Sequence, residues 1–195
     1  MMNAAYSLFD TPLGWCGIAW SEREGQPAVT GLQLPEARAE MTESRIARET
    51  GARQASSPHP AILQVIGRLR KHLQGELQDF LDVTLDLEGV GLFARRVYEA
   101  AREIPAGETR TYGDLAQALS RPAAARAVGQ ALGRNPIAII IPCHRVLAAG
   151  GRPGGFSAYG GRATKAKLLA IEGAAFGGQP GQLSLISALT PRLSH

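Results

Sequence analysis

The chain has 195 residues, which is enough for one large domain or two small ones with hydrophobic cores of their own. Because 45% of the residues are hydrophobic and 19% are charged, the chain is expected to fold. No apolar run approaches the length of a membrane span. The first ten residues lack the basic region and apolar core of a secretory signal, and the only cysteines, Cys16 and Cys143, lie far apart. These features exclude a disulfide framework and predict a protein of the reducing cytoplasm.

Charge divides the chain into two unequal parts. Residues 1–90 contain 8 Lys and Arg against 12 Asp and Glu, whereas residues 91–175 contain 12 against 5, and ten of those twelve cations are arginines. A basic block beside an acidic one is typical of a nucleic-acid-binding domain joined to a more neutral partner. Cations that serve solubility alone would give the same composition, so charge by itself leaves both readings open.

The N-terminal segment is predicted to form strands over residues 6–34. Residues 14–20 are rich in aromatic and branched side chains, and residues 28–34 alternate between apolar and polar. Turn-forming Gly25 and Pro27 lie between the two.

Two helices and a last strand are expected next. Residues 36–50 are charged with scattered apolar positions, which favours a surface helix. After the break at residues 56–60, a second helix is indicated by apolar side chains at helical spacing: Ile62, Val65, Ile66, Leu69 and Leu73. Residues 83–87 alternate as a strand would, so a small α/β domain is predicted to end near residue 88.

Beyond residue 90 the pattern becomes helical. Apolar residues favour a first helix that ends before the turn at residues 104–107: Phe93, Val97, Ala100 and Ala101. Thr111 can cap a short helix that has Asp114 in its first turn. A break at residues 120–122 precedes another helix over residues 123–132. Two short helices joined by a tight turn in an arginine-rich block form a helix-turn-helix pattern.

The second of these helices carries a single long side chain, Arg126, in its first two turns. Its small residues would let the backbone approach a partner closely, with Arg126 projecting from a smooth surface. The same residues suit a helix buried against a core, from which Arg126 reaches outward. Both interpretations remain open on the pattern alone.

The C-terminal part begins with an apolar run at residues 137–141, which is of strand length and leads into Cys143. Six glycines within residues 149–161 predict a mobile loop that wraps a ligand. A last helix is expected over residues 163–172, and residues 176–195 are predicted to be a flexible tail.

Cys143 is the candidate nucleophile. A thiol reacts as its thiolate, which needs a nearby base or positive field, and His144 and Arg145 follow Cys143 directly. Neighbouring residues of a strand point to opposite faces, so a sulfur–imidazole contact requires a turn, which Pro142 makes credible. An unpaired cysteine is also often simply part of the core.

Cys16 provides the contrast, because no titratable side chain lies within four residues of it, and it is expected to pack inside a strand. The other histidines are His59, His72 and His195, and none has metal-ligand spacing to either cysteine. No metal site, phosphate-binding loop or cofactor is therefore predicted.

Several segments together resemble the O6-alkylguanine-DNA alkyltransferases, the methylated-DNA–protein-cysteine methyltransferases. The likeness runs from about residue 93 to residue 173 and is carried by the following segments: IPAGET at 104–109, YGDLA at 112–116, RAVG at 126–129, Asn135-Pro136, IPCHRV at 141–146, and then Lys165, Leu168, Leu169 and Glu172. The first 90 residues match only in size, in strand-rich character and in the PHPAI lead at 58–62.

This resemblance implies a two-domain α/β protein. It implies a ribonuclease-H-like α/β domain over residues 1–88, a winged helix-turn-helix alkyltransferase domain over residues 89–175, and the tail 176–195. It also implies a monomer that binds alkylated double-stranded DNA from the minor groove and flips the damaged nucleotide out of the stack. No membrane, cofactor or obligate protein partner is expected.

The implied reaction moves a methyl or other alkyl group irreversibly from O6-alkylguanine to Cys143, in a single turnover, with O4-alkylthymine as a second candidate substrate. His144, through a water, would take the thiol proton, Glu172 would polarise His144, and Asn135 would brace the turn that holds the cysteine. Tyr112 would press on the 3′ phosphate and assist protonation of the leaving group.

The resemblance also implies DNA and base contacts. Arg126 would fill the gap left by the flipped base. The further DNA contacts are assigned to Tyr112, Ala125, Ala127, Gly129 and Arg145. The base pocket is assigned to Val146, Phe156, Ser157 and Tyr159.

Two features depart from the family pattern. Phe156 stands where many relatives have a tyrosine, and Tyr159 is a displaced substitute for the missing hydroxyl. The loop between Phe156 and Lys165 is two residues longer than in some relatives, and the chain lacks the cysteines and histidines that hold zinc in the N-terminal domain of others.

Three other functions fit part of the pattern. A non-catalytic damage sensor of the same fold would have tryptophan in place of Cys143. A regulator that reads the major groove would need polar side chains on the second helix, where there are alanines. A cysteine hydrolase would need an oxyanion site, of which the sequence shows no independent sign.

Overall fold

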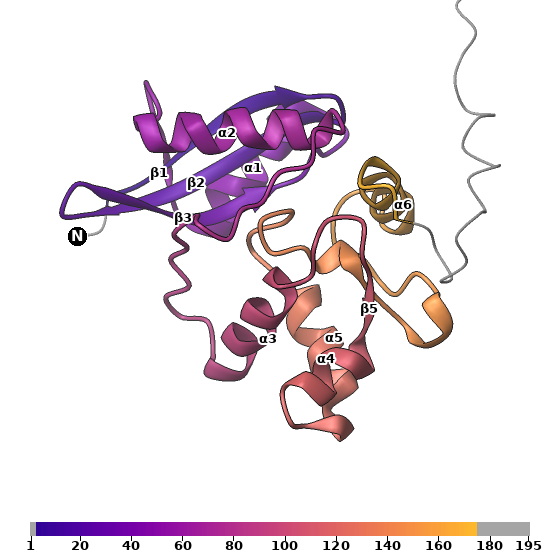
Figure 1. The fold of residues 1–195 in the computed structure, drawn as a ribbon. Coiled ribbons are helices and arrows are strands. Elements are labelled where there is room, and N and C mark those ends of the chain that lie inside the picture. The colour runs from indigo at the N-terminus through magenta and orange to yellow at the C-terminus, as the bar shows by residue number, and fades with distance from the viewer. Residues whose placement is uncertain (1–2, 175–195) are drawn as a thin grey trace, which may run out of the picture.

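A four-stranded sheet forms the N-terminal half of the described chain, residues 3–174 of a computed structural model (Figure 1). Its strands lie in the order β3-β2-β1-β4: β1 (Asn3–Thr11), β2 (Gly14–Arg23), β3 (Gln26–Gln33) and β4 (Arg53–Gln54). The first three are antiparallel neighbours, and the short β4 runs parallel to β1. The strands expected over residues 6–34 are thus confirmed, with β1 beginning earlier.

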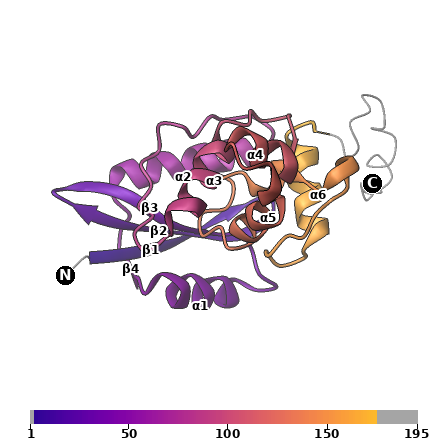
Figure 2. The ribbon, with the colours of Figure 1, turned by 90° about the horizontal axis from the view of Figure 1, so that it is seen from below.

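The two faces of this sheet are covered by different helices. Figure 2 shows α1 (Ala39–Thr50) and α2 (Pro60–Leu73) on opposite sides of the strands. Because successive side chains of a strand alternate between faces, Ile18 and Trp20 of β2 join the core that contains α2, whereas Ala19 packs with Ile46 of α1. Both helices were predicted, and each buries its apolar stripe on one face.

The outer edge of β3 is paired with two segments from elsewhere in the chain. Val29 donates to Thr84 and accepts from Asp86, and Leu32 forms a bridge with Ile137. The predicted strand at 83–87 is therefore wrong as a strand, since it is a single bridge at Leu85. Through Ile137, however, the sheet edge holds the segment that leads to Cys143.

The expected strand at 137–141 is also wrong. Residues 137–141 form tight turns in which Ile140 donates to the carbonyl of Ala138 and Ile141 to that of Ile137, and Ile139 has a φ of 68°. Isoleucines occupy these positions because the turn is buried, and the apolar run therefore does not indicate an extended strand. Periodicity cannot separate these two cases for a short apolar run.

Three helices build most of the C-terminal half: α3 (Leu92–Arg102), α4 (Tyr112–Ala118) and α5 (Ala125–Gly133). All three were predicted, and the last is preceded by one 3-10 turn, η1 (Pro122–Ala124). The α4 helix begins at a capping box, in which Thr111 and Asp114 each bond the other's backbone N–H. A two-stranded ladder of β5 (Arg110–Thr111) and β6 (Val146–Leu147) joins α4 to the segment after Cys143.

The last described elements are η2 (Cys143–Arg145), η3 (Ala149–Gly151) and α6 (Arg162–Ile171), the last confirming the predicted helix within a residue at each end. The predicted tail at 176–195 lies outside the described residues. One continuous apolar cluster extends from β2 and α2 to α3, α5 and α6, so the two halves share a core.

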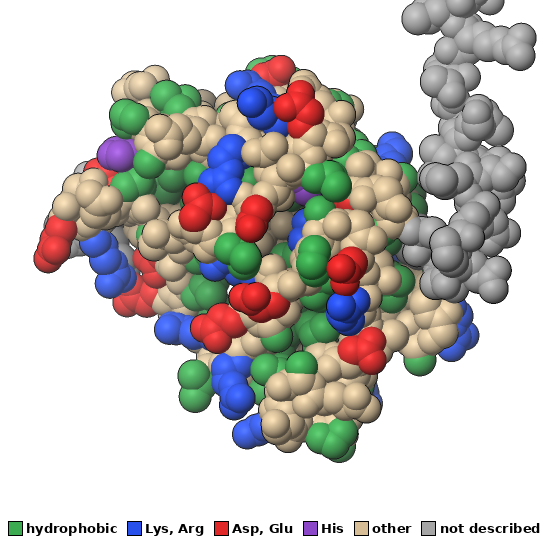
Figure 3. Space-filling model, in the orientation of Figure 1, with side chains coloured by type: hydrophobic (Ala, Val, Ile, Leu, Met, Phe, Trp, Pro, Cys, Tyr) green, Lys and Arg blue, Asp and Glu red, His purple; other side chains and the backbone are tan. Residues whose placement is uncertain are grey.

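The surface carries charges of both signs. Figure 3 shows basic and acidic side chains interspersed over one face, with no single-sign patch covering it. Among the described residues, no helix combines the length and the apolar character needed to cross a membrane.

The capping box makes a testable contribution to stability. Thr111→Ala is expected to lower the free energy of unfolding by about 1 kcal/mol, because the N–H of Asp114 loses its acceptor. Chemical denaturation followed by circular dichroism would measure this. Gln117→Ala, at an exposed position of the same helix, should change the midpoint little, and an equal loss in both variants would contradict the capping role.

Candidate active site

A turn braced by Asn135 holds Cys143 in place. The Asn135 amide donates to the carbonyl of Ile141 at 2.8 Å and accepts the N–H of Ile137 at 3.0 Å, so one side chain closes both ends of the buried loop. The carbonyl of Pro136 accepts from Leu32 of β3 at 2.9 Å. The turn is therefore fixed from within by Asn135 and from outside by the edge of the sheet.

Cys143 begins the 3-10 turn η2 and is only 9% exposed. Burial raises the pKa of its thiol, and the Asn135 amide and the Lys165 ammonium oppose that rise without cancelling it. The resting group is thus a protonated thiol, which needs a base when it reacts. The turn that a Cys143–His144 pair requires is present, as predicted from Pro142.

The Glu172 carboxylate, directly after α6, accepts four hydrogen bonds in the interior. Its Oε1 accepts from Nε2 of His144 and Nε2 of His72, both at 2.9 Å, and from Nη2 of Arg145 at 2.8 Å. Its Oε2 accepts from Nε of Arg145 at 2.9 Å, which makes the guanidinium contact bidentate. Burial alone would raise the pKa of Glu172, but the bonds from the imidazoles and the guanidinium outweigh it and hold the pKa below its usual range.

The ionised carboxylate fixes the protonation of His144. Burial lowers the pKa of His144 against the opposing effect of Glu172, so the imidazole is neutral at pH 7. A neutral imidazole has one N–H, and the bond to Glu172 places it on Nε2. The lone pair therefore lies on Nδ1, which has no hydrogen-bond partner among the described residues. This nitrogen is the available proton acceptor at the site.

Lys165 is a buried cation of α6 near the thiol. Its Nζ donates to the carbonyl of Val146 at 2.6 Å, and burial lowers its pKa to about 8. Its charge favours the thiolate of Cys143. The sequence placed Lys165 in the family pattern but gave it no role. The signal available in the sequence was a lysine on the side of the predicted helix that carries Leu168 and Leu169, where a charged side chain needs a partner.

Tyr112 lies beside Cys143, at the start of α4. Burial and the nearby thiolate both raise the pKa of its phenol, so the hydroxyl is a proton donor at neutral pH. The loop after Cys143 crosses this ring so closely that a Cβ on Gly154 would lie 2.3 Å from the Tyr112 hydroxyl. Only glycine fits there, so this part of the predicted loop rests on the ring.

A groove of about 560 Å³ runs between α5 and the glycine-rich loop. It brings together many of the predicted DNA and base contacts: Tyr112, Ala125, Arg126, Gly129, Phe156 and Ser157. Arg126 is exposed at this groove. Both interpretations of its helix leave Arg126 exposed, and the helix buries Val128 and Leu132 on its other side, so the role of Arg126 stays a prediction.

Four other predicted contacts lie elsewhere. The prediction that Arg145 contacts DNA is wrong. Its side chain is only 6% exposed, and its guanidinium donates to Glu172 and to the carbonyl of Ile104. Val146 is fully buried, Tyr159 is 53% exposed before α6, and Ala127 lines a separate hollow beside α3. None of these four lines the groove.

His72 was missed as a site residue. It lies on α2, in the N-terminal half, and meets Glu172 across a sequence separation of 100 residues. The available signal was its place in the helix, since position 72 falls on the apolar stripe with Leu69 and Leu73. A histidine on a buried stripe requires a polar partner.

Cys16 is fully buried in β2, and burial raises the pKa of its thiol to about 12, as expected for a packing residue. No group of three His, Cys, Asp or Glu within residues 3–174 could hold a metal ion.

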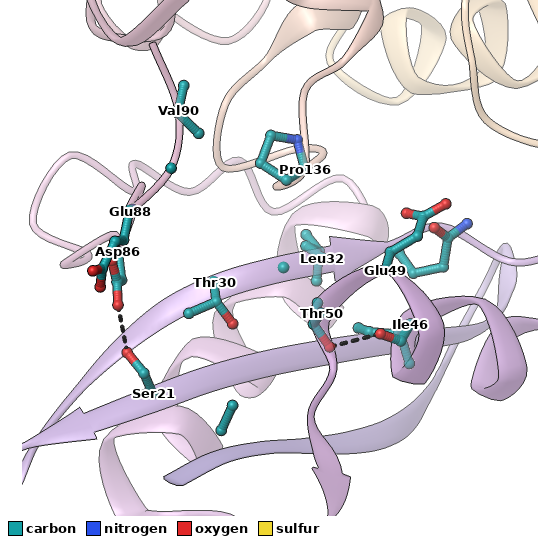
Figure 4. A pocket seen from close by; sticks show the side chains of 14 residues that line it. Ser21, Thr30, Leu32, Ile46, Glu49, Thr50, Asp86, Glu88, Val90 and Pro136 are labelled. Atoms are coloured by element: carbon teal, nitrogen blue, oxygen red, sulfur yellow. Dashed lines mark hydrogen bonds between the residues drawn. The ribbon is translucent and has the colours of Figure 1, made fainter. Parts of the chain in front are cut away.

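A second hollow of about 410 Å³ lies where the sheet meets the Pro136 turn (Figure 4). Thr30 and Leu32 of β3 line it together with Thr50 of α1, and Asp86 accepts a hydrogen bond from Ser21 at its edge. Its lining includes none of the predicted site residues. The predicted reactive groups therefore lie around Cys143 and outside this hollow.

The chain is similar to known proteins over most of its length. Residues 92–174 match the family model for the 6-O-methylguanine DNA methyltransferase, DNA binding domain. A methylated-DNA–protein-cysteine methyltransferase of Mycolicibacterium paratuberculosis is 40% identical over 86% of this chain and 91% of its own. One from Methanosarcina acetivorans is 40% identical over 86% of this chain and 97% of its own.

Solved structures give the same result. The Mycobacterium tuberculosis OGT in complex with DNA has a TM-score of 0.66 and 36% identity, over 86% of this chain and 92% of that one. The O6-methylguanine-DNA methyltransferase of Pyrococcus kodakaraensis has a TM-score of 0.63 and 30% identity, over 88% and 99%. The mixed α/β fold is thus shared with these proteins.

The Asn135 brace can be tested through stability. Asn135→Ala leaves the N–H of Ile137 without its acceptor and takes one of two donors from the Ile141 carbonyl, which still accepts the N–H of Cys143. It is expected to cost roughly 1 to 3 kcal/mol of unfolding free energy. Urea denaturation would measure it, with Arg134→Ala at the preceding exposed position as the control. A loss below that of the control would show that the turn holds without Asn135.

Proposed function

The chain belongs to the family of methylated-DNA–protein-cysteine methyltransferases, and on that basis we propose the following course for the alkyl transfer by which it repairs DNA. The acceptor is the Sγ of Cys143. The observation that carries this assignment is a buried thiol next in sequence to a neutral histidine whose proton-accepting nitrogen, Nδ1, has no partner among the described residues.

The alkyl group moves in one displacement. The thiol proton passes to Nδ1 of His144 through a water, as the family resemblance implies, while the ionised Glu172 stabilises the imidazolium through Nε2. Sγ attacks the alkyl carbon, an S–C bond forms, and the C–O6 bond breaks with its electron pair going to the guanine. Tyr112, whose raised pKa keeps its proton, supplies the proton that the leaving base takes up.

The product is a thioether on Cys143. Cleaving it would need a nucleophile for the alkyl carbon. His144 stays hydrogen-bonded to Glu172, and no step of the proposed reaction supplies such a nucleophile, so the thiol is not regenerated. Each molecule therefore repairs one lesion. The substrate is O6-alkylguanine in double-stranded DNA, and the chain acts alone.

The groove between α5 and the glycine-rich loop receives the flipped nucleotide. The small residues Ala125 and Gly129 let the α5 backbone approach the duplex, and Arg126 occupies the space that the base vacates. Phe156 and Ser157 lie on the loop side of the same groove and contact the base. Phe156 offers only a ring face there, so its contact is stacking.

The two halves correspond to two domains, residues 1–88 and 89–175. The sheet order β3-β2-β1-β4 with a helix on each face supports a ribonuclease-H-like first domain. The α4–α5 pair followed by the β5–β6 ladder supports a winged helix-turn-helix second domain.

A non-catalytic damage sensor of the same fold is the alternative, and nothing in the site favours it. The acceptor, the base and the orienting carboxylate are all present. The curated relatives over most of the chain are named as methyltransferases.

The acceptor can be tested directly. Incubation with duplex DNA containing O6-methylguanine is expected to add one methyl group to the peptide containing Cys143, one per protein molecule, measured by mass spectrometry. Cys143→Ala should take up none, whereas Cys16→Ala, the same change at the other buried cysteine, should react fully. Repeated turnover, or a methyl on Cys16, would overturn the mechanism.

The role of Arg126 is separable from the chemistry. Arg126→Ala is expected to slow the reaction with duplex DNA at least tenfold while leaving the reaction with free O6-benzylguanine nearly unchanged, because only the duplex requires a flipped base. Arg152→Ala removes an exposed arginine outside the groove and controls for loss of phosphate attraction. Equal losses on both substrates would make Arg126 structural.

A further inference from the structure

His72 is a buried polar residue of α2 that the transfer mechanism above does not use. Its side chain is 1% exposed and lies between the ring of Phe80, at 5.5 Å in an edge-on contact, and the Glu172 carboxylate. It comes from the N-terminal half, whereas Cys143, His144 and Glu172 come from the C-terminal half.

The hydrogen bonds of His72 fix which of its nitrogens carries a proton. Nδ1 accepts the backbone N–H of Gln78 at 3.2 Å, so Nδ1 is a bare lone pair. The proton of the neutral ring is then on Nε2, which donates to Oε1 of Glu172 at 2.9 Å. A backbone N–H cannot reverse its role, so His72 is held as a donor to the carboxylate.

The same oxygen, Oε1, also receives the N–H of His144. A carboxylate that His72 holds at one angle presents Oε1 to His144 in a fixed direction, and this keeps the His144 proton on Nε2 and the lone pair on Nδ1. His72 also withdraws part of the negative charge that would otherwise favour a charged His144. Both effects keep His144 a neutral acceptor.

We propose that His72 is a positioning residue for the alkyl transfer. By donating to Glu172, it orients the carboxylate and withdraws part of its negative charge, and this carboxylate sets the basicity of His144. The N-terminal half thereby acts on the chemistry of the C-terminal half through one hydrogen bond. This inference rests on the proposed function, because it concerns the same Cys143 reaction.

The charged surroundings of His72 are defined. Glu172 faces it from the end of α6, and His144 and Arg145 of η2 share that carboxylate. On the Phe80 side, Arg68 of α2 lies over the ring at 5.1 Å, and Arg102 of α3 donates to the Phe80 carbonyl.

The test compares His72→Phe, which fills the space without a donor, with His72→Gln, whose amide N–H can still reach Glu172. Because the pKa of His144 is lowered from its ordinary value of 6.5, the wild-type single-turnover rate with O6-benzylguanine should stay constant as the pH falls to 6.5. The rate should decrease only at lower pH, where His144 becomes protonated. In His72→Phe the pKa of His144 rises, so the fall should begin at higher pH, and the plateau rate should drop about tenfold, as for the loss of one charge-assisted hydrogen bond. His72→Gln should recover most of both.

A structural role is separated by a matched control. Val65→Ala removes packing from the same helix without touching Glu172, so it should lower the melting temperature and leave the pH profile in place. If Val65→Ala displaces the profile as His72→Phe does, or if His72→Phe keeps the wild-type profile, the proposal is overturned.

A second readout does not depend on activity. Imidazole ¹⁵N shifts should show the proton of His72 on Nε2, and a His144 titration that moves to higher pH in His72→Phe. An unmoved titration overturns the positioning role. A wild type that places no methyl on Cys143 would overturn the proposed function alone, since the His144 titration is measured without substrate.

Discussion

The buried Glu172 carboxylate is the interaction on which the rest of the site depends. Removing an ionised carboxyl from water is costly, and the cost is offset only when every oxygen finds good donors. Here the donors come from α2, through His72, and from η2, through His144 and Arg145, while the acceptor ends α6. Satisfying one charge therefore fixes three segments relative to one another. The same bonds keep the carboxylate ionised, which is what allows it to define the proton position on His144.

This arrangement explains how a protected thiol can still react. A cysteine exposed as a thiolate would be open to oxidation and to unselective alkylation, whereas burial keeps Cys143 protonated at rest. In the proposed transfer, the neutral His144 supplies the base and the nearby Lys165 supplies the positive field, and neither makes the thiolate permanent. In the proposed transfer, the thiol therefore reacts only with a substrate that brings its alkyl carbon to Sγ.

The N-terminal half makes direct contacts with the segments that carry the reactive groups. The outer edge of β3 pairs with the Pro136 turn, and α2 delivers His72 to the carboxylate. Neither contact belongs to the groove lining, which consists of C-terminal residues. The surface of small residues that we propose faces DNA therefore does not have to carry the contacts that support the Pro136 turn.

The local features were readable in the sequence because they depend on near neighbours: the apolar stripe of α2, the helix cap at Thr111, and the turn at Pro142-Cys143. The combined pattern around Cys143 also identified the family, and with it Glu172 and Asn135. The strands expected at 83–87 and 137–141 failed because a short apolar run shows burial and not backbone direction. Arg145 was taken for a DNA contact, and His72 was left without a role, for one shared reason. Each is defined by a carboxylate 27 or 100 residues away, and only the tertiary structure brings those charges together.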